Sequence, residues 1–172
     1  MSLSLIPDHA FKKITEITPQ FLHSRGINLL LLDLDNTIAP YYVEAPEKAV
    51  LRWCETMEKN GVKLYLFSNS HVNGRVDSFA TALGIGAIKD AGKPSTAAIK
   101  NALAEAGRET RQAALVGDQI FTDVLGANRA GISSIIVDPI TFKPVCWQNI
   151  LRRLRYYAEA PFRGLCTNRS WK

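Results

Sequence analysis

The chain has 172 residues, of which 47% are hydrophobic and 22% charged; this is typical of one soluble globular domain and excludes a disordered chain. No apolar run approaches the roughly 20 residues of a membrane span, and the N-terminus lacks the layout of a signal peptide. Three scattered cysteines favour neither a disulfide framework nor a zinc site. We therefore expect a single domain over residues 1–172, located in the cytoplasm.

The net charge of +5 is unevenly placed, because residues 141–172 hold seven Lys/Arg against one acid, Glu159. The basic character is thus a C-terminal feature, and such a segment is suited to contact an anionic surface.

The elements are expected in the following chain order. Apolar spacing at Phe11, Ile14, Ile17 and Leu22 predicts a helix over residues 8–24, interrupted by Pro19. A core over 27–140 then alternates short apolar strands with helices that end at glycine. Strands are expected at 27–34, 62–67, 86–89, 112–116 and 133–137, and helices at 46–59, 73–83, 94–106, 122–130 and 148–159.

This alternation predicts an α/β, Rossmann-like fold in which a central parallel sheet of about five strands carries helices on both faces. The segments 35–62 and 68–93 have room for one helix each, the second with a short strand. Neither holds a large cap domain, so the site should be open and should accept a large substrate.

Polar residues follow four of the predicted strands, at the edge where open parallel sheets bind ligands. They are Asp33 and Asp35, then Ser68 and Asn69, then Lys93 in a loop, then Asp118 and Asp123. We interpret this convergence of carboxylates, a hydroxyl and a lysine as a catalytic site.

Asp33 and Asp35 are two residues apart, so in extended backbone both carboxylates point to one side and repel each other unless a cation lies between them. With Asp118 they form an oxygen-only cluster that suits Mg²⁺. A carboxylate nucleophile divides phosphate hydrolysis into two easier steps, and Ser68 and Lys93 can bind the phosphate oxygens.

Each residue alone also has an ordinary structural explanation. An aspartate after a strand often caps a helix or closes a turn, and Asp123 could cap the helix that follows it. Thr37 is expected to fix the turn after Asp35 through a local hydrogen bond. His71 lies close to Ser68 and could reach substrate, but its pattern assigns it no role.

At these residues the chain resembles the haloacid dehalogenase-like (HAD) superfamily. Four motifs occur in order. Asp33–Thr37 matches D-x-D-x-T, Ser68 matches the Ser/Thr motif, Gly92–Pro94 matches the lysine motif, and Gly117–Asp123 matches G-D-x-x-x-x-D.

The resemblance implies a role for each of these residues. Asp33 would be the nucleophile and a metal ligand, and Asp35 the general acid/base, with its main-chain carbonyl on the metal. Asp118 would be a metal ligand supported by Asp123 from the second coordination shell. Ser68, Asn69 and Lys93 would bind the phosphate.

A finer resemblance is to the YqeG-like group of class IIIA HAD phosphatases. It is carried by the opening Leu-Ile-Pro-Asp, by Ile17–Pro19, Gly26-Ile27 and Phe67–Asn69, and by the first and last motifs. This group is similar to phosphatidylglycerophosphate phosphatases, so a lipid phosphate is a candidate substrate.

The C-terminal helix leaves two interpretations open. Ile150, Leu151, Leu154 and Tyr157 fall on one helical face, and Arg152, Arg153, Arg155 and Glu159 lie elsewhere. In the first interpretation, the helix lies on an anionic membrane and gives the protein peripheral contact with the inner face of that membrane. In the second, the helix packs its apolar side on the core of the domain and leaves its basic side in solvent.

The alternative to a phosphatase is a non-catalytic HAD-fold module that contacts RNA or membrane through the basic C-terminus. The intact motif set favours catalysis, and no specific nucleic acid is expected. The oligomeric state is left open.

Overall fold

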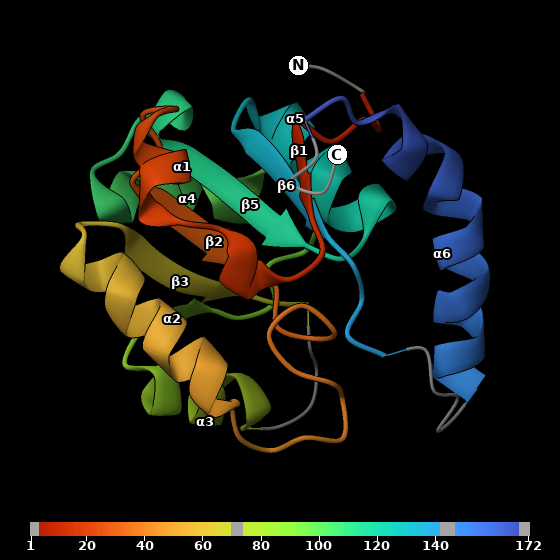
Figure 1. Cartoon of the computed structure of the whole chain (residues 1–172), viewed down its shortest axis with the longest axis horizontal. Coiled ribbons are helices and arrows are strands. Elements are labelled where there is room, and N and C mark those ends of the chain that lie inside the picture. The colour runs from red at the N-terminus through yellow and green to blue at the C-terminus, as the bar shows by residue number, and fades with distance from the viewer. Residues whose placement is uncertain (1–3, 70–73, 142–146, 169–172) are drawn as a thin grey trace.

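In the computed structural model, which describes residues 4–69, 74–141 and 147–168 (147–153 as backbone only), six parallel strands form one sheet (Figure 1). The sheet order is β1-β6-β5-β2-β3-β4. The strands are β1 (His9–Phe11), β2 (Leu29–Leu32), β3 (Lys63–Phe67), β4 (Gly86–Ile88), β5 (Ala113–Gly117) and β6 (Ser133–Val137). The predicted α/β fold with a parallel sheet is therefore confirmed, with one strand more than expected.

The helices connect these strands in chain order. They are α1 (Pro19–His23), α2 (Lys48–Lys59), α3 (Arg75–Leu83), α4 (Ala97–Ala106), α5 (Leu125–Ala130) and α6 (Trp147–Leu165). Short 3₁₀ turns η1 (Ile14–Glu16) and η2 (Thr110–Gln112) precede α1 and β5, and a π-helical turn η3 (Ile120–Val124) precedes α5.

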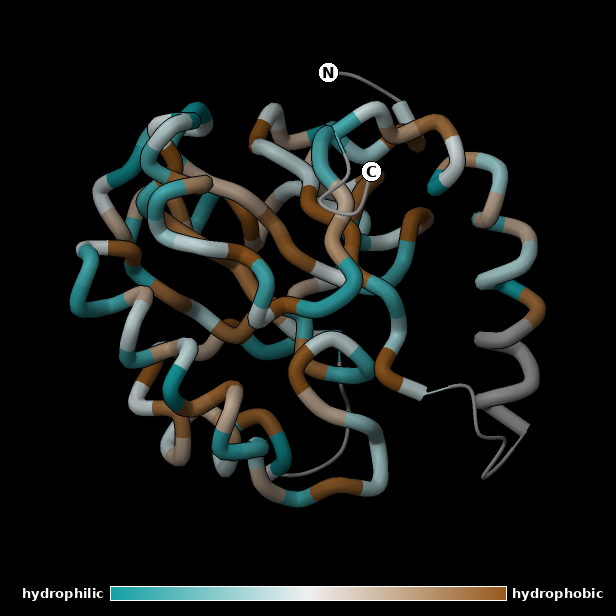
Figure 2. Tube along the Cα trace, viewed as in Figure 1, coloured by the Kyte–Doolittle hydropathy of each residue, from teal (hydrophilic) through white to brown (hydrophobic). Residues whose placement is uncertain are grey.

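The strands are buried on both faces, which explains their continuous apolar sequences. Successive side chains of a strand point to opposite sides. Leu30 and Leu32 accordingly pack with α1, α2 and α3, whereas Leu29 and Leu31 pack with α4 and α5. Figure 2 shows the hydrophobic positions gathered along the central strands.

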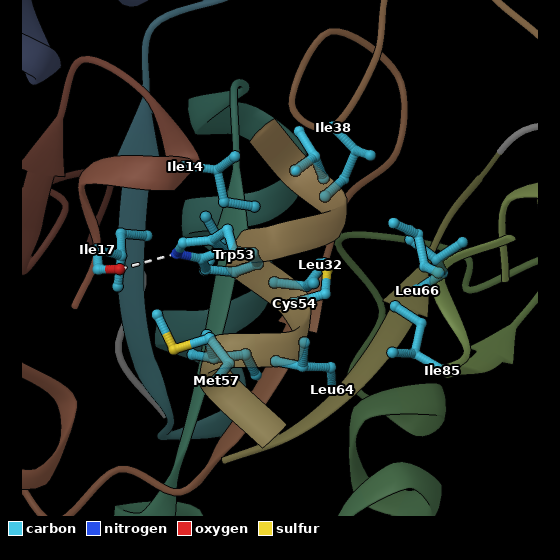
Figure 3. Packing of buried hydrophobic residues seen from close by; sticks show 14 of the residues in the cluster. Ile14, Ile17, Leu32, Ile38, Trp53, Cys54, Met57, Leu64, Leu66 and Ile85 are labelled. Carbon is cyan, nitrogen blue, oxygen red and sulfur yellow. Dashed lines mark hydrogen bonds between the residues drawn. The ribbon is translucent and has the colours of Figure 1, made fainter. Parts of the chain in front are cut away.

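The first of these two clusters is organised around Trp53 of α2 (Figure 3). Its ring lies among aliphatic side chains, and its indole Nε1–H donates a 2.8 Å hydrogen bond to the carbonyl of Ile17. A buried polar group of this kind needs such a partner. The bond therefore fixes the segment before α1 against helix α2.

The helix predicted over residues 8–24 is wrong. His9–Phe11 instead forms the edge strand β1, paired with β6, and α1 begins only at Pro19, where Thr18 accepts a 3.1 Å bond from the Phe21 amide. Asp8 anchors the strand because its carboxylate accepts bonds from the amide and hydroxyl of Ser134. Pairing with a distant strand thus outweighs local helical spacing.

The last helix is longer than the predicted 148–159, and its orientation contradicts the core-packed interpretation. In the part whose side chains are described, Leu154 and Tyr157 are 62% and 61% exposed, whereas Glu159 is buried. Polar contacts of Glu159 and Arg163, together with Phe162, attach α6 to the domain. The side chains of Ile150, Leu151, Arg152 and Arg153 lie outside the described residues.

Within the described ranges, the connections β2–β3 and β3–β4 hold only α2 and α3, respectively, so neither carries a cap domain. Across the same ranges, no helix is long and apolar enough to cross a membrane.

Replacing Trp53 with Phe keeps most of the apolar ring but leaves the Ile17 carbonyl without its buried donor. We expect a loss of roughly 1–3 kcal/mol in the free energy of unfolding, measured by urea denaturation. Met57→Leu, a volume-conserving change in the same cluster, is the control. A Trp53→Phe variant as stable as the wild type would contradict this account.

Candidate functional site

The residues predicted from four strand ends meet at the carboxyl edge of the sheet, around one pocket of about 210 Å³. It is smaller than the roughly 300–1,000 Å³ of pockets that enclose a drug-sized ligand. It therefore accommodates the end of a substrate and leaves the rest outside. Its lining residues are Asp33, Asp35, Ser68, Asn69, Lys93, Gln119, Thr122 and Arg155.

Asp33 lies just beyond β2, where its amide still bonds to the Val116 carbonyl of β5 at 2.9 Å. The chain then turns sharply, with Asn36 in the left-handed region at φ 66°, which asparagine tolerates better than most residues. Thr37 donates a 3.3 Å bond to Asp33 Oδ2, as expected for a residue that fixes this turn. The position of Asp33 is thus determined by the sheet and by the turn.

Lys93 is buried between two carboxylates. Its Nζ lies 2.5 Å from Asp33 Oδ1 and 2.7 Å from Asp123 Oδ1. Burial acts to lower the pKa of Lys93, but the charges of Asp123 and Asp33 outweigh it and raise this pKa above its ordinary value. The site therefore contains a buried ammonium group that joins the end of β2 to the turn η3.

Asp33, Asp118 and Asp123 form a buried acidic cluster whose ligand atoms lie within 4.8 Å of one another. Burial first, and the Asp33 and Asp123 charges next, raise the pKa of Asp118 well above its ordinary value. Burial also raises the pKa of Asp123 to about 6, against the opposing charge of Lys93. Among the residues described, buried Oδ1 of Asp118 has no hydrogen-bond partner. A divalent cation fits this donor set.

Asp123 makes contacts beyond those of a residue that only caps a helix. Its Oδ2 accepts a 3.1 Å bond from the Gln119 amide, and its carboxyl group lies where a side chain on Gly117 would be. Glycine at 117 is therefore required for Asp123 to approach the end of β5. The sequence predicted Asp123 in the second coordination shell of the metal. In the structure its carboxyl group belongs to the same cluster as those of Asp33 and Asp118.

Asp35 faces a buried arginine that was not anticipated. Arg75, at the start of α3, donates from Nε to Asp35 Oδ1 at 3.2 Å. Its terminal nitrogens donate to the carbonyls of Val43 and Pro40 in the loop after β2. Arg75 therefore ties the Asp35 carboxyl group to that loop.

Ser68 is buried at the end of β3, and the side chain of Asn69 forms two bonds with the backbone of Lys93, at 3.0 and 3.2 Å. These bonds connect the β3 edge to the loop that carries the lysine. His71, which the sequence left without a role, lies outside the described residues.

Helix α6 supplies the contacts that sequence reasoning missed. Arg163 donates to the carbonyls of Val137 and Asp118, and the buried Glu159 accepts a 3.0 Å bond from the Phe121 amide. Arg155 reaches the pocket itself. The i,i+4 spacing of Arg155 and Glu159 was a signal for their pairing, but nothing local indicates that α6 lies beside the site.

Comparison with known proteins agrees with this geometry. A family model described as HAD-hydrolase-like matches residues 90–139. The chain is 35% identical over 135 residues to the "Probable phosphatase YqeG" of Bacillus subtilis, and the match covers 78% of each chain. The chain belongs to the YqeG-like group of HAD-superfamily phosphatases.

Two more distant relatives carry a more specific name. The chain is 27% identical over 144 residues to the chloroplastic phosphatidylglycerophosphate phosphatase 1 of Chlamydomonas reinhardtii, covering 79% of this chain and 54% of that protein. It is 23% identical over 147 residues to the corresponding Arabidopsis thaliana protein, covering 80% and 42%. This chain thus spans about half the length of either relative.

Solved structures support the fold. The 3-deoxy-D-manno-octulosonate 8-phosphate phosphatase of Moraxella catarrhalis, in complex with magnesium ion, phosphate ion and KDO, is similar with a TM-score of 0.57 at 19% identity, covering 87% of this chain and 79% of that one. A cobalt-bound Haemophilus influenzae phosphatase gives 0.53 at 12% identity, covering 81% and 91%.

Replacing Asp118 with Asn removes one charge from a crowded, buried acidic cluster. We expect the metal-free protein to melt roughly 2–4 °C higher, because about 1 kcal/mol of repulsion is relieved. The rise in melting temperature that Mg²⁺ produces in the wild type should disappear. The exposed Asp77→Asn is the control, and an undiminished Mg²⁺ response in Asp118→Asn would argue against this cluster as the metal site.

Proposed function

We propose that this phosphatase is Mg²⁺-dependent, forms an aspartyl phosphate on Asp33, and acts at an open site on a lipid phosphate such as phosphatidylglycerophosphate. The observation that carries the proposal is the buried contact of Asp33 with Lys93, next to Asp118 and Asp123. It brings together a nucleophile and a positive charge that line the pocket, with carboxylates beside them that can bind a metal.

In the proposed reaction, a carboxylate oxygen of Asp33 attacks phosphorus while the bond to the leaving oxygen breaks. Asp35 enters this step protonated and gives its proton to that oxygen, and Arg75 keeps its carboxyl group oriented for the transfer. Water then attacks the phosphorus of the acyl phosphate, Asp35 takes a proton from this water, and the Asp33–phosphorus bond breaks to release phosphate. Asp33 and Asp35 return to their initial states.

The phosphate oxygens are proposed to be bound by the Ser68 hydroxyl, the Asn69 backbone and the Lys93 ammonium group. Mg²⁺ would be held by Asp33, Asp118 and the main-chain carbonyl of Asp35, with Asp123 beside them, and when bound it neutralises phosphate charge. The unpartnered Asp118 oxygen and the crowding of carboxylates support this assignment.

Two features support a lipid phosphate as substrate. The first is that two relatives are phosphatidylglycerophosphate phosphatases. The second is that the small pocket takes only the phosphorylated end of a substrate, and α6 beside it exposes Leu154 and Tyr157. We propose that this exposed apolar side of α6 makes peripheral contact with a membrane, supported by the basic charge of the C-terminus.

Replacing Asp33 with Asn removes the nucleophile while leaving the size of the side chain almost unchanged. We expect kcat/KM for para-nitrophenyl phosphate with Mg²⁺ to fall by roughly 1,000-fold or more. Glu109→Gln, at the opposite end of β5, should retain wild-type turnover. Magnesium-dependent turnover that survived in Asp33→Asn would disprove the assignment of the nucleophile.

The membrane proposal predicts that Leu154→Ser combined with Tyr157→Ser weakens binding to vesicles. Because each side chain loses apolar burial in lipid, partition should fall roughly tenfold or more. Sedimentation with phosphatidylglycerol/phosphatidylcholine vesicles at low salt measures this effect. Ile6→Ser, an exposed apolar residue before β1, is the matched control. If the wild type fails to sediment with these vesicles, the membrane contact is wrong.

A further inference from the structure

Arg155 is a pocket-lining residue that neither the sequence motifs nor the proposed reaction uses. It lies on α6, more than thirty residues after the last HAD motif, and contributes to the same pocket as Asp33 and Lys93. Its side chain is 32% exposed, whereas those of Lys93 and Asp33 are 2% and 8% exposed. The transferred phosphoryl group would have to reach the more buried Asp33, so the more exposed Arg155 lies on the outer side of the pocket, where the leaving group would be.

The guanidinium group of Arg155 is held in a fixed orientation. Its Nε donates a 3.1 Å bond to Glu159 Oε1, and that oxygen also accepts from the Phe121 amide at 3.0 Å. The Phe121 ring lies against the guanidinium carbon at 5.5 Å. Within the described part of the chain, the terminal nitrogens have no hydrogen-bond partner. An arginine that is oriented in this way can donate two hydrogen bonds to one oxyanion, as a bidentate donor.

The charged groups around the pocket bear on what Arg155 can bind. The base of the site holds the carboxyl groups of Asp33, Asp118 and Asp123 beside the ammonium group of Lys93, and the charge of Arg163 on α6 also acts on Asp118. These groups surround the position of the transferred phosphoryl group, so a second anion on the substrate needs a donor of its own. Glu159 divides its charge between Arg155 and Arg163, at 3.1 and 3.8 Å. Arg155 therefore retains positive potential toward the pocket.

We infer that Arg155 is a specificity residue that binds a second oxyanion of the substrate, a phosphodiester carried by the leaving group within a few bonds of the phosphomonoester. The inference rests on the proposed function, since it assumes a phosphoryl group on Asp33. The small pocket limits how far apart the two anionic groups can lie. The same donor would accept a carboxylate, so the two anions must be compared directly.

Three soluble phosphomonoesters test the inference. Glycerophosphoglycerol phosphate carries a phosphodiester, phosphoglycolate carries a carboxylate, and glycerol 3-phosphate carries no second anion. For Arg155→Ala we expect the ratio of kcat/KM for the phosphodiester compound to that for glycerol 3-phosphate to fall roughly 10- to 100-fold, the range for a charge-assisted pair. Arg155→Lys should recover part of the ratio, and Arg111→Ala, an exposed arginine before β5, should leave it unchanged.

Binding provides a second readout that needs no turnover. Titration calorimetry with glycerophosphoglycerol phosphate and Mg²⁺ compares Asp33→Asn with Asp33→Asn/Arg155→Ala, and we expect the Kd to rise roughly 10- to 100-fold. If Arg155→Ala melts at a lower temperature, Arg155→Gln replaces it, because glutamine keeps a donor near Glu159 without the charge.

The outcomes separate this inference from the proposed function. Equal losses on all three substrates would mean that Arg155 contacts the transferred phosphoryl group or only supports α6, and would overturn the inference. A larger loss on phosphoglycolate than on the phosphodiester would do the same. Wild-type protein that hydrolyses none of the compounds contradicts the proposed function; the titration then decides, and an unchanged Kd in the double variant overturns the inference.

Discussion

The site depends on the buried ammonium group of Lys93, which lies between Asp33 and Asp123. Taking three aspartates out of water at 4.8 Å or less is costly unless opposite charge compensates them. Lys93 supplies part of that charge and joins the end of β2 and the turn η3 to its own loop. The negative charge that it leaves uncompensated, above all at Asp118, is what a divalent cation would balance.

The parallel sheet makes this arrangement possible. Strands such as Leu29–Leu32 are buried on both faces, so their register is fixed by packing and their carboxyl ends deliver polar residues to one edge. Local devices then refine the positions: the bonds of Asn69 to the Lys93 backbone, and the missing side chain at Gly117 that admits Asp123. The packing of the core thus sets the positions of the side chains at the site.

Sequence reasoning predicted what local pattern controls. Short apolar runs located five strands, glycines marked the ends of the helices between them, and the motif residues Asp33, Ser68, Lys93 and Asp118 do meet at one edge. The sequence-based prediction failed where the structure of a segment depends on contacts with residues far away in the sequence. The segment His9–Phe11 has helical spacing but becomes a strand because the edge of β6 is available to it. Arg75 and α6 likewise took their roles from contacts that no local pattern records.

In the part of helix α6 whose side chains are described, Glu159 is buried while Leu154 and Tyr157 are exposed, and Arg155 of the same helix lines the pocket. The central claim remains the nucleophile, and the most direct test is borohydride reduction during turnover with Mg²⁺, followed by peptide mass spectrometry. An aspartyl phosphate on Asp33 predicts conversion of that residue alone to homoserine. Reduction at another aspartate, or none while turnover continues in a trapping time course, would contradict the account.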